Sequence, residues 1–379
     1  MDHKTFLRFL LKGNLTFLDV PSSQQREYLY SLPEPKNDIK RSFYQYKCHN
    51  FFAPKWKPIL LDIGALFFYF PILLFYIVKG LFVGKKKRCE AISDLNGMQE
   101  VIPNVVLEKY QVSFVGKNPI GALCFSDIPF VLSIFFSCFP ACFFSMKAAM
   151  KVAQYSQLIR WYSPKCIIAH LEYSFSSSLL TAYCNKCGVR HINVMHGEKM
   201  FNIVDAFFSF DECYVWGEHY VNLFTDLRAE GSQFRVAVPP SLCIDTHRFY
   251  NSALWSDYKY YLADFTEEEI KSIVSSMAFA HTQGKTVKYR FHPRYDRTAL
   301  INKYIAPTDI EDPHKVSIQE SVSSCDVAVG SYSTVLNQAY CSGKKVILDD
   351  VTYCHQYEKF KDLRYCLIEE GCPRLSSLQ

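Results

Sequence analysis

The chain has 379 residues, which is more than a single α/β core usually holds and enough for two domains. Its 42 Lys and Arg residues nearly balance its 37 Asp and Glu residues, which excludes a protein built to coat nucleic acid. Aromatic residues make up 16% of the chain, and much of the Phe lies in two apolar blocks of the N-terminal half. This clustering indicates contact with lipid or a wide buried surface.

The two apolar blocks come first in chain order. Ile63–Val78 contains no charged residue, is divided by Pro71, and precedes a basic cluster at residues 85–88 that would favour an anionic cytoplasmic leaflet. Ile128–Phe144 is of similar length and is divided by Pro140. A spanning helix needs about 20 apolar residues, so these short blocks favour interfacial or re-entrant elements of a membrane-associated protein. Buried helices of a soluble domain and short true spans are the alternatives.

The 15 cysteines are scattered along the chain, and the N-terminal segment lacks an A-x-A-like cleavage site. We therefore expect a reduced, cytosolic setting. Cys184 and Cys187 have the spacing of half a zinc site, but no second pair follows them. This isolation favours ordinary packing over metal binding.

After residue 150 short β-rich runs alternate with helical stretches, which is typical of a parallel sheet built from βα units. A predicted helix over Ser174–Cys187 ends at Gly188, a residue suited to a left-handed C-cap. The predicted strands of this first series are Cys166–Leu171, His191–Met195, Glu212–Trp216 and Phe234–Val238.

A second βα series follows. Thr266 and Glu269 have capping-box spacing and predict a helix over Glu267–Thr282, while Ser317 and Glu320 predict another helix start. The predicted strands are Tyr258–Ala263, Thr286–Phe291, Asp326–Val329 and Val346–Leu348, with a helix over Val335–Tyr340.

These patterns predict an α/β protein with two Rossmann-like domains facing a central cleft. We place the acceptor-side domain at residues 1–255, with apolar insertions at about 59–84 and 121–145, and the nucleotide-binding domain at residues 256–379.

Polar residues follow two strands of the second series, where ligands of open α/β sheets bind. Gly330 allows a phosphate to approach the backbone, and the hydroxyls that follow it can donate hydrogen bonds to that phosphate. Their simpler role is to cap a helix. The predicted set for binding a negatively charged leaving group is Arg290, His292, Arg294, Gly330, Ser331, Ser333 and Thr334.

The first series supplies candidates for acid–base chemistry. His196 and Glu198 follow the strand His191–Met195, and transfer of a group to a hydroxyl needs a base for the acceptor proton. We predict Glu198 as the base with His196 positioning it, and leave open both the reverse assignment and a purely structural His196. Glu172 is a third candidate.

The segments RFHPR at 290–294 and AVGSYSTVLNQAYCSGKKVI at 328–347 resemble bacterial surface-polysaccharide glycosyltransferases of the GT-B fold. The similarity covers residues 166–350 and is nearest to the sialyltransferase and polysialyltransferase group. His292-Pro293 matches its HP motif, and Ser333-Thr334 stands in place of its serine pair. His196-Gly197 is similar to an element of capsule Kdo transferases and CDP-glycerol phosphotransferases.

The chain departs from that family at two places. The acidic motif expected before the HP motif stands after it, as Glu369-Glu370-Gly371, and Gln338 occupies the place of a ribose-binding Glu. The resemblance still implies donor binding by Gln338, a metal-independent reaction and no cofactor other than the nucleotide-sugar substrate.

The expected function is transfer of a sugar from a nucleotide donor, first a CMP-sialic-like sugar and second a UDP-sugar. The expected acceptor is an O-antigen or capsule oligosaccharide, on a lipid carrier, at the cytoplasmic face of the inner membrane. The alternatives are a CDP-glycerol or CDP-ribitol phosphotransferase, a sugar-nucleotide epimerase, and a non-catalytic assembly protein.

Overall fold

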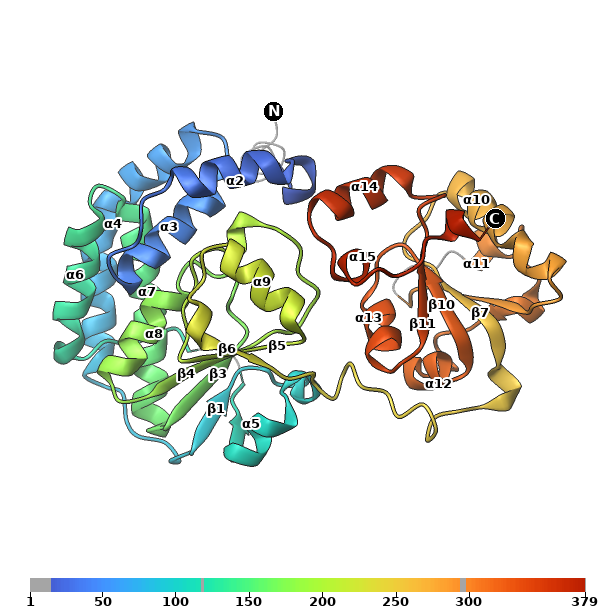
Figure 1. The fold of residues 1–379 in the computed structure, drawn as a ribbon. Helices are drawn as coiled ribbons and strands as arrows, with labels where there is room; N and C mark the ends of the chain where they lie inside the picture. The colour runs from blue at the N-terminus through green and yellow to red at the C-terminus, as the bar shows by residue number, and fades with distance from the viewer. Residues whose placement is uncertain (1–14, 117–118, 294–297, 379) are drawn as a thin grey trace. The chain divides into compact units, whose positions relative to one another are not determined.

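A computed structural model describes residues 15–116, 119–293 and 298–378. Its internal contacts divide the chain into two compact units, shown in Figure 1. The first contains Met1–His196 and Phe201–Ala237, and the second contains Gly197–Met200 and Val238–Gln379. This division falls earlier in the chain than the expected boundary at residue 255, because residues 238–255 group with the second unit.

The first unit is built on a six-stranded sheet with the order β2-β1-β3-β4-β5-β6. Every pairing in this sheet is parallel, so all six strands end at the same edge. The strands are β1 (Ala91–Ser93), β2 (Val112–Phe114), β3 (Cys166–Ala169), β4 (Arg190–Val194), β5 (Glu212–Val215) and β6 (Phe234–Val236). The middle strands β3 and β4 are buried at every residue except Arg190, as expected of a parallel sheet covered by helices.

Helices α3, α4, α6, α7 and α8 gather on one side of this sheet (Figure 1). Together they enclose a large apolar cluster, in which α7 contributes Phe144 and Val152. The helices of the first unit are α2 (Ser22–Ser31), α3 (Asp38–Phe51), α4 (Trp56–Gly80), α5 (Asn104–Lys109), α6 (Ile128–Cys138), α7 (Cys142–Tyr162), α8 (Ser177–Lys186) and α9 (Glu218–Asp226).

The second unit has a five-stranded sheet with the order β11-β10-β7-β8-β9, and its pairings are also all parallel. Its strands are β7 (Ser256–Tyr261), β8 (Val287–Arg290), β9 (Ile310–Glu311), β10 (Cys325–Gly330) and β11 (Lys345–Leu348). Its helices are α10 (Glu267–Thr282), α11 (Thr298–Ile301), α12 (Ile318–Ser323), α13 (Thr334–Cys341), α14 (Cys354–Asp362) and α15 (Cys366–Glu369).

The predicted α/β class with two Rossmann-like units is confirmed by these two parallel sheets. Helix α10 has the predicted bounds, and both capping boxes form, at Thr266 with Glu269 and at Ser317 with Glu320. Strands β1, β2 and β9 were not predicted, because two or three residues are too few to show a strand pattern.

The first apolar block differs from the prediction, since Pro71 lies inside the continuous helix α4 instead of dividing it. Pro71 is exposed, so its ring meets no packed neighbour, and the burial of the opposite face of α4 offsets the one lost backbone hydrogen bond. The second block is divided as predicted, because α6 ends at Cys138 and α7 begins at Cys142.

Candidate functional site

The carboxyl edge of the second sheet brings two predicted motifs to one side of the unit. Strand β7 lies between β8 and β10 and is parallel to both, so the loops at His292 and at Ser331 leave the same edge. Two strand spacings separate these loops, which is about 10 Å along the sheet. A phosphate or sugar phosphate is of a size to contact both loops.

The turn after β10 carries the glycine and hydroxyl side chains that were predicted to form an anion cradle. A Cβ on Gly330 would lie 3.1 Å from the carbonyl oxygen of Tyr261. The glycine therefore allows the ends of β10 and β7 to approach each other closely. Ser333 is the N-cap of α13, and its hydroxyl oxygen accepts a hydrogen bond from the Val335 N–H at 3.2 Å. Its O–H hydrogen still has its donor capacity. Ser331 is half-buried and Thr334 is exposed at the first turn of the helix.

His292 is half-buried just beyond β8. The side chain therefore stands at the edge where the sequence predicted it. Arg294, which was predicted to accompany it, lies outside the described residues.

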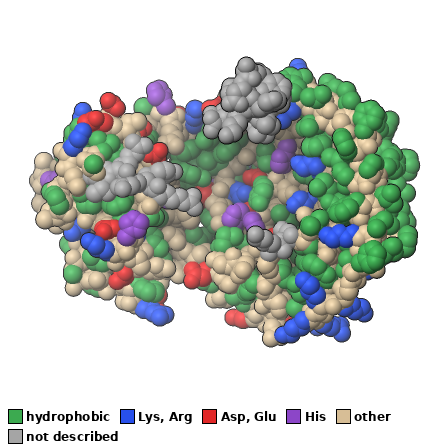
Figure 2. Space-filling view, turned by 180° about the vertical axis from the view of Figure 1, so that it is seen from behind, with side chains coloured by type: hydrophobic (Ala, Val, Ile, Leu, Met, Phe, Trp, Pro, Cys, Tyr) green, Lys and Arg blue, Asp and Glu red, His purple; other side chains and the backbone are tan. Residues whose placement is uncertain are grey.

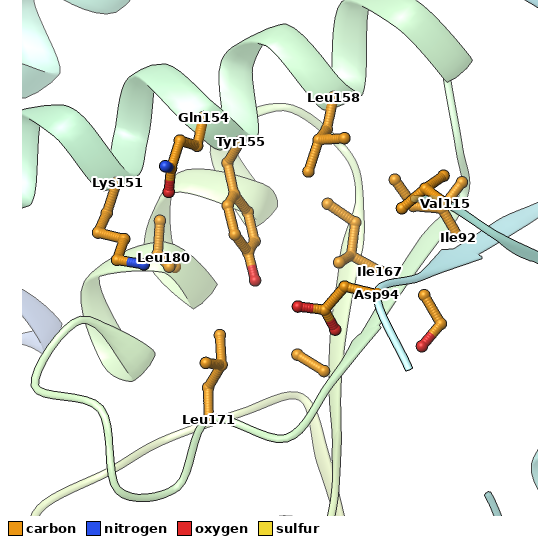
Figure 3. A pocket seen from close by; sticks show the side chains of 12 residues that line it. Ile92, Asp94, Val115, Lys151, Gln154, Tyr155, Leu158, Ile167, Leu171 and Leu180 are labelled. Atoms are coloured by element: carbon orange, nitrogen blue, oxygen red, sulfur yellow. The ribbon is translucent and has the colours of Figure 1, made fainter. Parts of the chain in front are cut away.

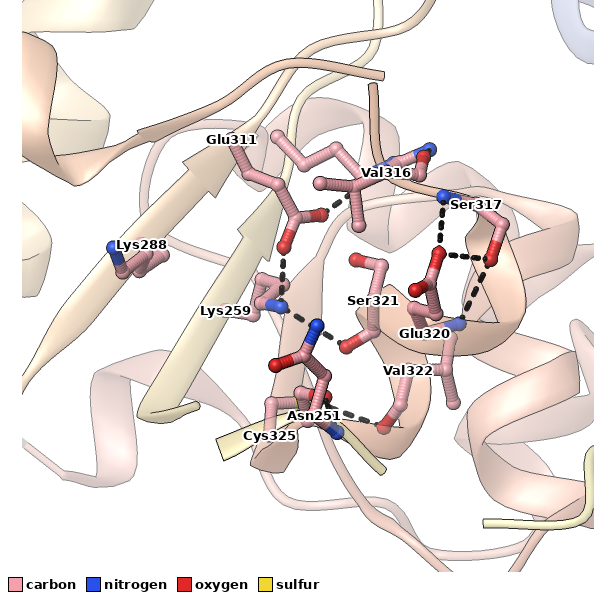
Figure 4. Close-up of polar contacts among 12 residues, drawn as sticks. Asn251, Lys259, Lys288, Glu311, Val316, Ser317, Glu320, Ser321, Val322 and Cys325 are labelled. Carbon is pink, nitrogen blue, oxygen red and sulfur yellow. Dashed lines mark hydrogen bonds and ion pairs between the residues drawn. The ribbon is translucent and has the colours of Figure 1, made fainter. Parts of the chain in front are cut away.

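Arg290 has a different environment from the one predicted. Its guanidinium contacts the Glu311 carboxylate at 2.7 Å and donates to the Val316 carbonyl at 2.9 Å, and the residue is 7% exposed. Lys259, which is fully buried, contacts the other Glu311 oxygen at 2.6 Å (Figure 4). Arg290 therefore belongs to a buried ion network joining β7, β8 and β9, and we assign it a supporting role within the second sheet.

The charges in this network depend on one another. Burial opposes ionisation of Glu311, but Lys259 and Arg290 outweigh burial and hold the pKa of the Glu311 carboxyl below its usual range. Removing one partner would leave a buried charge without compensation.

Gln338 also has a structural contact. Its side-chain amide donates to the Ser241 carbonyl at 2.8 Å, and nearby Ser342 accepts from the Ile244 N–H at 2.9 Å. These bonds hold segment 238–255 against α13. The ribose role that the resemblance implies for Gln338 would need the amide to exchange this partner.

The carboxyl edge of the first sheet carries two histidine–carboxylate pairs. His196, after β4, places Nδ1 3.9 Å from Oε1 of Glu172, which follows β3. His170, also after β3, places Nδ1 3.9 Å from Oδ1 of Asp94, which follows β1. The two imidazole rings are 4.6 Å apart in an edge-to-face arrangement. Four titratable side chains from three neighbouring strands therefore form one cluster.

Glu172 is fully buried, and its surroundings fix its position. The Asn193 side chain donates to Glu172 Oε2 at 3.1 Å and accepts from the Leu171 N–H at 2.6 Å. Gln45 donates to the Glu172 carbonyl at 2.8 Å. The Glu172 carboxylate therefore has a fixed position, with Oε1 3.9 Å from His196 Nδ1, which is longer than a direct hydrogen bond.

A small cavity of about 30 Å³ adjoins the cluster and shares Asp94 with it. Figure 3 shows Asp94 and the Tyr155 hydroxyl pointing into this cavity, with Lys151 and Gln154 on the α7 side. The space is of the order of one water molecule. Burial raises the pKa of the Tyr155 hydroxyl well above its ordinary value, so Tyr155 acts here as a neutral hydrogen-bonding group.

Glu198 groups by its contacts with the second unit, whereas His196 groups with the first. Burial, with the charge of Glu198 as the second cause, raises the pKa of Tyr332 to about 12. Within the first unit, Glu172 places a carboxylate oxygen 3.9 Å from His196 Nδ1.

Sequence reasoning missed Asp94 and His170. His170 directly follows the apolar strand β3, but the predicted strand Cys166–Leu171 placed it inside the strand and hid its position at the end. Asp94 could not be found either, because the three-residue strand β1 before it was not predicted.

No family model matches the chain, and no curated protein matches its sequence. Solved structures do match its backbone. The UDP-GlcNAc 2-epimerase from Methanocaldococcus jannaschii has a TM-score of 0.45 and 13% identity, over 77% of this chain and 90% of that one. The glycotransferase of kitacinnamycin has a TM-score of 0.46 and 10% identity, over 76% and 86%.

The wall teichoic acid polymerase TagF has a TM-score of 0.39 and 10% identity, over 84% of both chains. At these identities and TM-scores, the similarity assigns neither a family nor an activity to this chain.

Proposed function

We propose that the protein is a glycosyltransferase that moves a sugar from a nucleotide donor to a hydroxyl of an oligosaccharide acceptor. The observation that carries this proposal is the cluster of two histidine–carboxylate pairs at the carboxyl edge of the first sheet. Such a pair is suited to take a proton from a hydroxyl. In this proposal the first unit supplies the base and the second unit binds the donor.

His196 is the proposed base. Its Nδ1 lies 3.9 Å from Oε1 of the buried Glu172, and in this proposal Nε2 accepts the acceptor proton while the Glu172 carboxylate stabilises the imidazolium that results. The Glu198 base that the sequence suggested becomes the alternative. His170 and Asp94 complete the polar wall beside the acceptor.

The proposed reaction is a direct displacement at the anomeric carbon of the donor sugar. The acceptor oxygen forms a bond to the anomeric carbon as its proton passes to His196, and the bond from that carbon to the donor phosphate oxygen breaks. The leaving nucleotide keeps the electron pair. His292, Ser331, Ser333, Thr334 and the N–H groups at the start of α13 would stabilise its negative charge.

The choice of donor and acceptor is supported by the resemblance of two motifs to those of surface-polysaccharide glycosyltransferases. His292-Pro293 and Ser333-Thr334 favour a CMP-sialic-like donor, with UDP-sugars second. The proposed acceptor is a surface-polysaccharide or lipid-linked oligosaccharide, and the proposed reaction uses no metal ion and no cofactor besides the nucleotide sugar.

Nucleotide release by the purified full chain tests the base. With CMP-sialic acid or a UDP-sugar and total membrane lipid as acceptor source, His196→Gln should lower kcat by about 100-fold or more while donor binding is retained. His281→Gln, at an exposed position on α10, is the matched control and should keep full activity.

Three results would contradict the proposal. Full activity of His196→Gln would remove the imidazole from the reaction. Loss of activity in Glu198→Gln alone would return the base to Glu198, and CMP release that requires CDP-glycerol would replace glycosyl transfer with phosphotransfer.

A further inference from the structure

Helix α4 carries an uninterrupted apolar strip on its outer surface. Among the described residues it is the one helix long and apolar enough to cross a membrane. Exposed fractions along this strip run from 47% at Val78 to 72% at Phe67. We call the strip the α4 face, and it consists of Ile59, Ile63, Phe67, Phe70, Leu74 and Val78. Soluble proteins rarely expose an apolar surface of this extent without a binding partner.

The opposite side of α4 is packed against the body of the first unit. Ala65, Tyr69, Leu73, Tyr76 and Gly80 recur every three or four residues and are all buried. A Cβ on Gly80 would lie 1.9 Å from the Leu123 carbonyl oxygen, so the end of α4 touches the neighbouring backbone. From Ala65 to its end, the helix is therefore held against the first unit, chiefly by α7.

This packing decides between a spanning and an interfacial helix. A spanning helix is surrounded by lipid or by other membrane segments, whereas the charged loops of a Rossmann-like unit cannot enter hydrocarbon. Only the outer half of α4 is open to a bilayer, which corresponds to the shallow insertion of about 5–10 Å typical of interfacial helices.

Helix α6 extends the apolar surface beside α4. Phe135 of α6 stacks on Tyr69 at 4.6 Å and contacts Phe70 at 5.8 Å, so the two helices are neighbours. Phe136 and Phe139 are exposed at 73% and 62%. Figure 2 shows hydrophobic side chains gathered over much of the first unit, at the right of the view.

Cations border the α4 face at both ends. Lys55 and Lys57 flank its beginning, and residues 85–88 (KKKR) follow its end and are exposed. Arg160 donates to the Gly80 and Val83 carbonyls at 2.9 and 3.0 Å, which fixes the segment that leads to these cations. Asp62 is the acidic residue of α4, and it accepts from the Phe143 N–H at 2.8 Å.

We propose that the α4 face docks the protein on a lipid bilayer that contains anionic lipids, with α4 lying in the plane of the interface. The apolar side chains enter the acyl boundary, and residues 85–88 contact the anionic headgroups. Among apolar partners, a bilayer fits best because the cations sit at the rim of the apolar strip, where headgroups would lie. The proposal is independent of the transferase activity.

Flotation of the full chain with vesicles tests the apolar contact. The parent protein should bind vesicles of phosphatidylcholine and phosphatidylglycerol, and Phe67→Ser/Leu74→Ser should weaken binding at least about tenfold. Val105→Ser/Leu107→Ser, two exposed apolar residues on α5, is the matched control and should bind as the parent does. Both variants should unfold at the parent's temperature, because the changed side chains are exposed.

Removal of charge tests the orientation. Lys85→Gln/Lys87→Gln/Arg88→Gln should lose about fivefold in binding per cation on anionic vesicles, and nothing on neutral ones. Lys303→Gln/Lys315→Gln/Lys345→Gln lowers the net charge equally on the second unit and should leave binding unchanged.

Three outcomes would overturn the proposal. They are no binding by the parent, equal losses in the test and control variants, and resistance of the bound protein to alkaline carbonate. The last result would indicate a spanning helix.

Discussion

His191 shows at the residue scale how burial sets protonation in the first unit. It is fully buried on β4, with Nε2 3.1 Å from the Tyr155 hydroxyl and Nδ1 2.8 Å from the Thr181 hydroxyl. Thr181 can donate its hydrogen to the Ser209 carbonyl at 2.8 Å, so a neutral imidazole with its proton on Nδ1 satisfies every group. Burial lowers the pKa of His191 to about 3.

This burial predicts a pH dependence of stability. The pKa of His191 is lower in the folded chain than its ordinary value of 6.5, so between about pH 6.5 and pH 3 the unfolded chain binds the additional proton. The free energy of unfolding should fall by about 1.4 kcal/mol per pH unit as pH decreases through this window. The free energy of unfolding, measured by urea at a series of pH values, should depend on pH more steeply in the parent than in His191→Asn. The difference should correspond to about one proton. Equal slopes would contradict a neutral buried His191.

Single residues also show how much of the candidate site could be predicted from the sequence. His196 and His292 were recognisable because each lies two residues after the end of a strand. The sequence could not show that Arg290 is paired with Glu311, since β9, which carries Glu311, has only two residues.

At the element scale, helix α4 depends on two glycines in different ways. A Cβ at Gly80 would meet the Leu123 carbonyl oxygen at 1.9 Å, whereas a Cβ at Gly64 would meet nothing within 4 Å. Gly64 lies in the interior of the helix, where helix propensity favours alanine, whereas Gly80 is its last residue, where this preference is weaker.

This contrast gives a matched pair of variants. Gly80→Ala should lower the free energy of unfolding by about 1–3 kcal/mol because the backbones must separate. Gly64→Ala should raise it by up to about 1 kcal/mol. Thermal or urea unfolding of the two variants checks this, and destabilisation of the same size in both would show that the close approach at Leu123 is not tight.

At the scale of the whole molecule, the proposed binding of the nucleotide by the second unit predicts which ligands raise the free energy of unfolding. The cradle after β10 and His292 should bind a nucleotide, because both lie at the carboxyl edge of the second sheet. A ligand at 100 times its Kd adds about 2.7 kcal/mol to the free energy of unfolding.

A thermal-shift comparison of CMP, CDP, UDP and GDP tests this binding. CMP or UDP should raise the Tm of the parent, and His292→Ala should reduce that rise, whereas His281→Ala should not. A rise that persists in full in His292→Ala would place the nucleotide elsewhere.

The sequence by itself determined the α/β class, the βα rhythm after residue 150 and the bounds of α10, because hydrophobic period and capping residues act locally. It also placed the HP motif and the serine-rich turn at strand ends. Tertiary structure alone decided that Arg290 supports the second sheet, and that His196 is paired with Glu172 and adjoins the His170–Asp94 pair. Tertiary packing also decided that one side of α4 stays exposed. Those outcomes depend on contacts between residues distant in the chain, which no local pattern specifies.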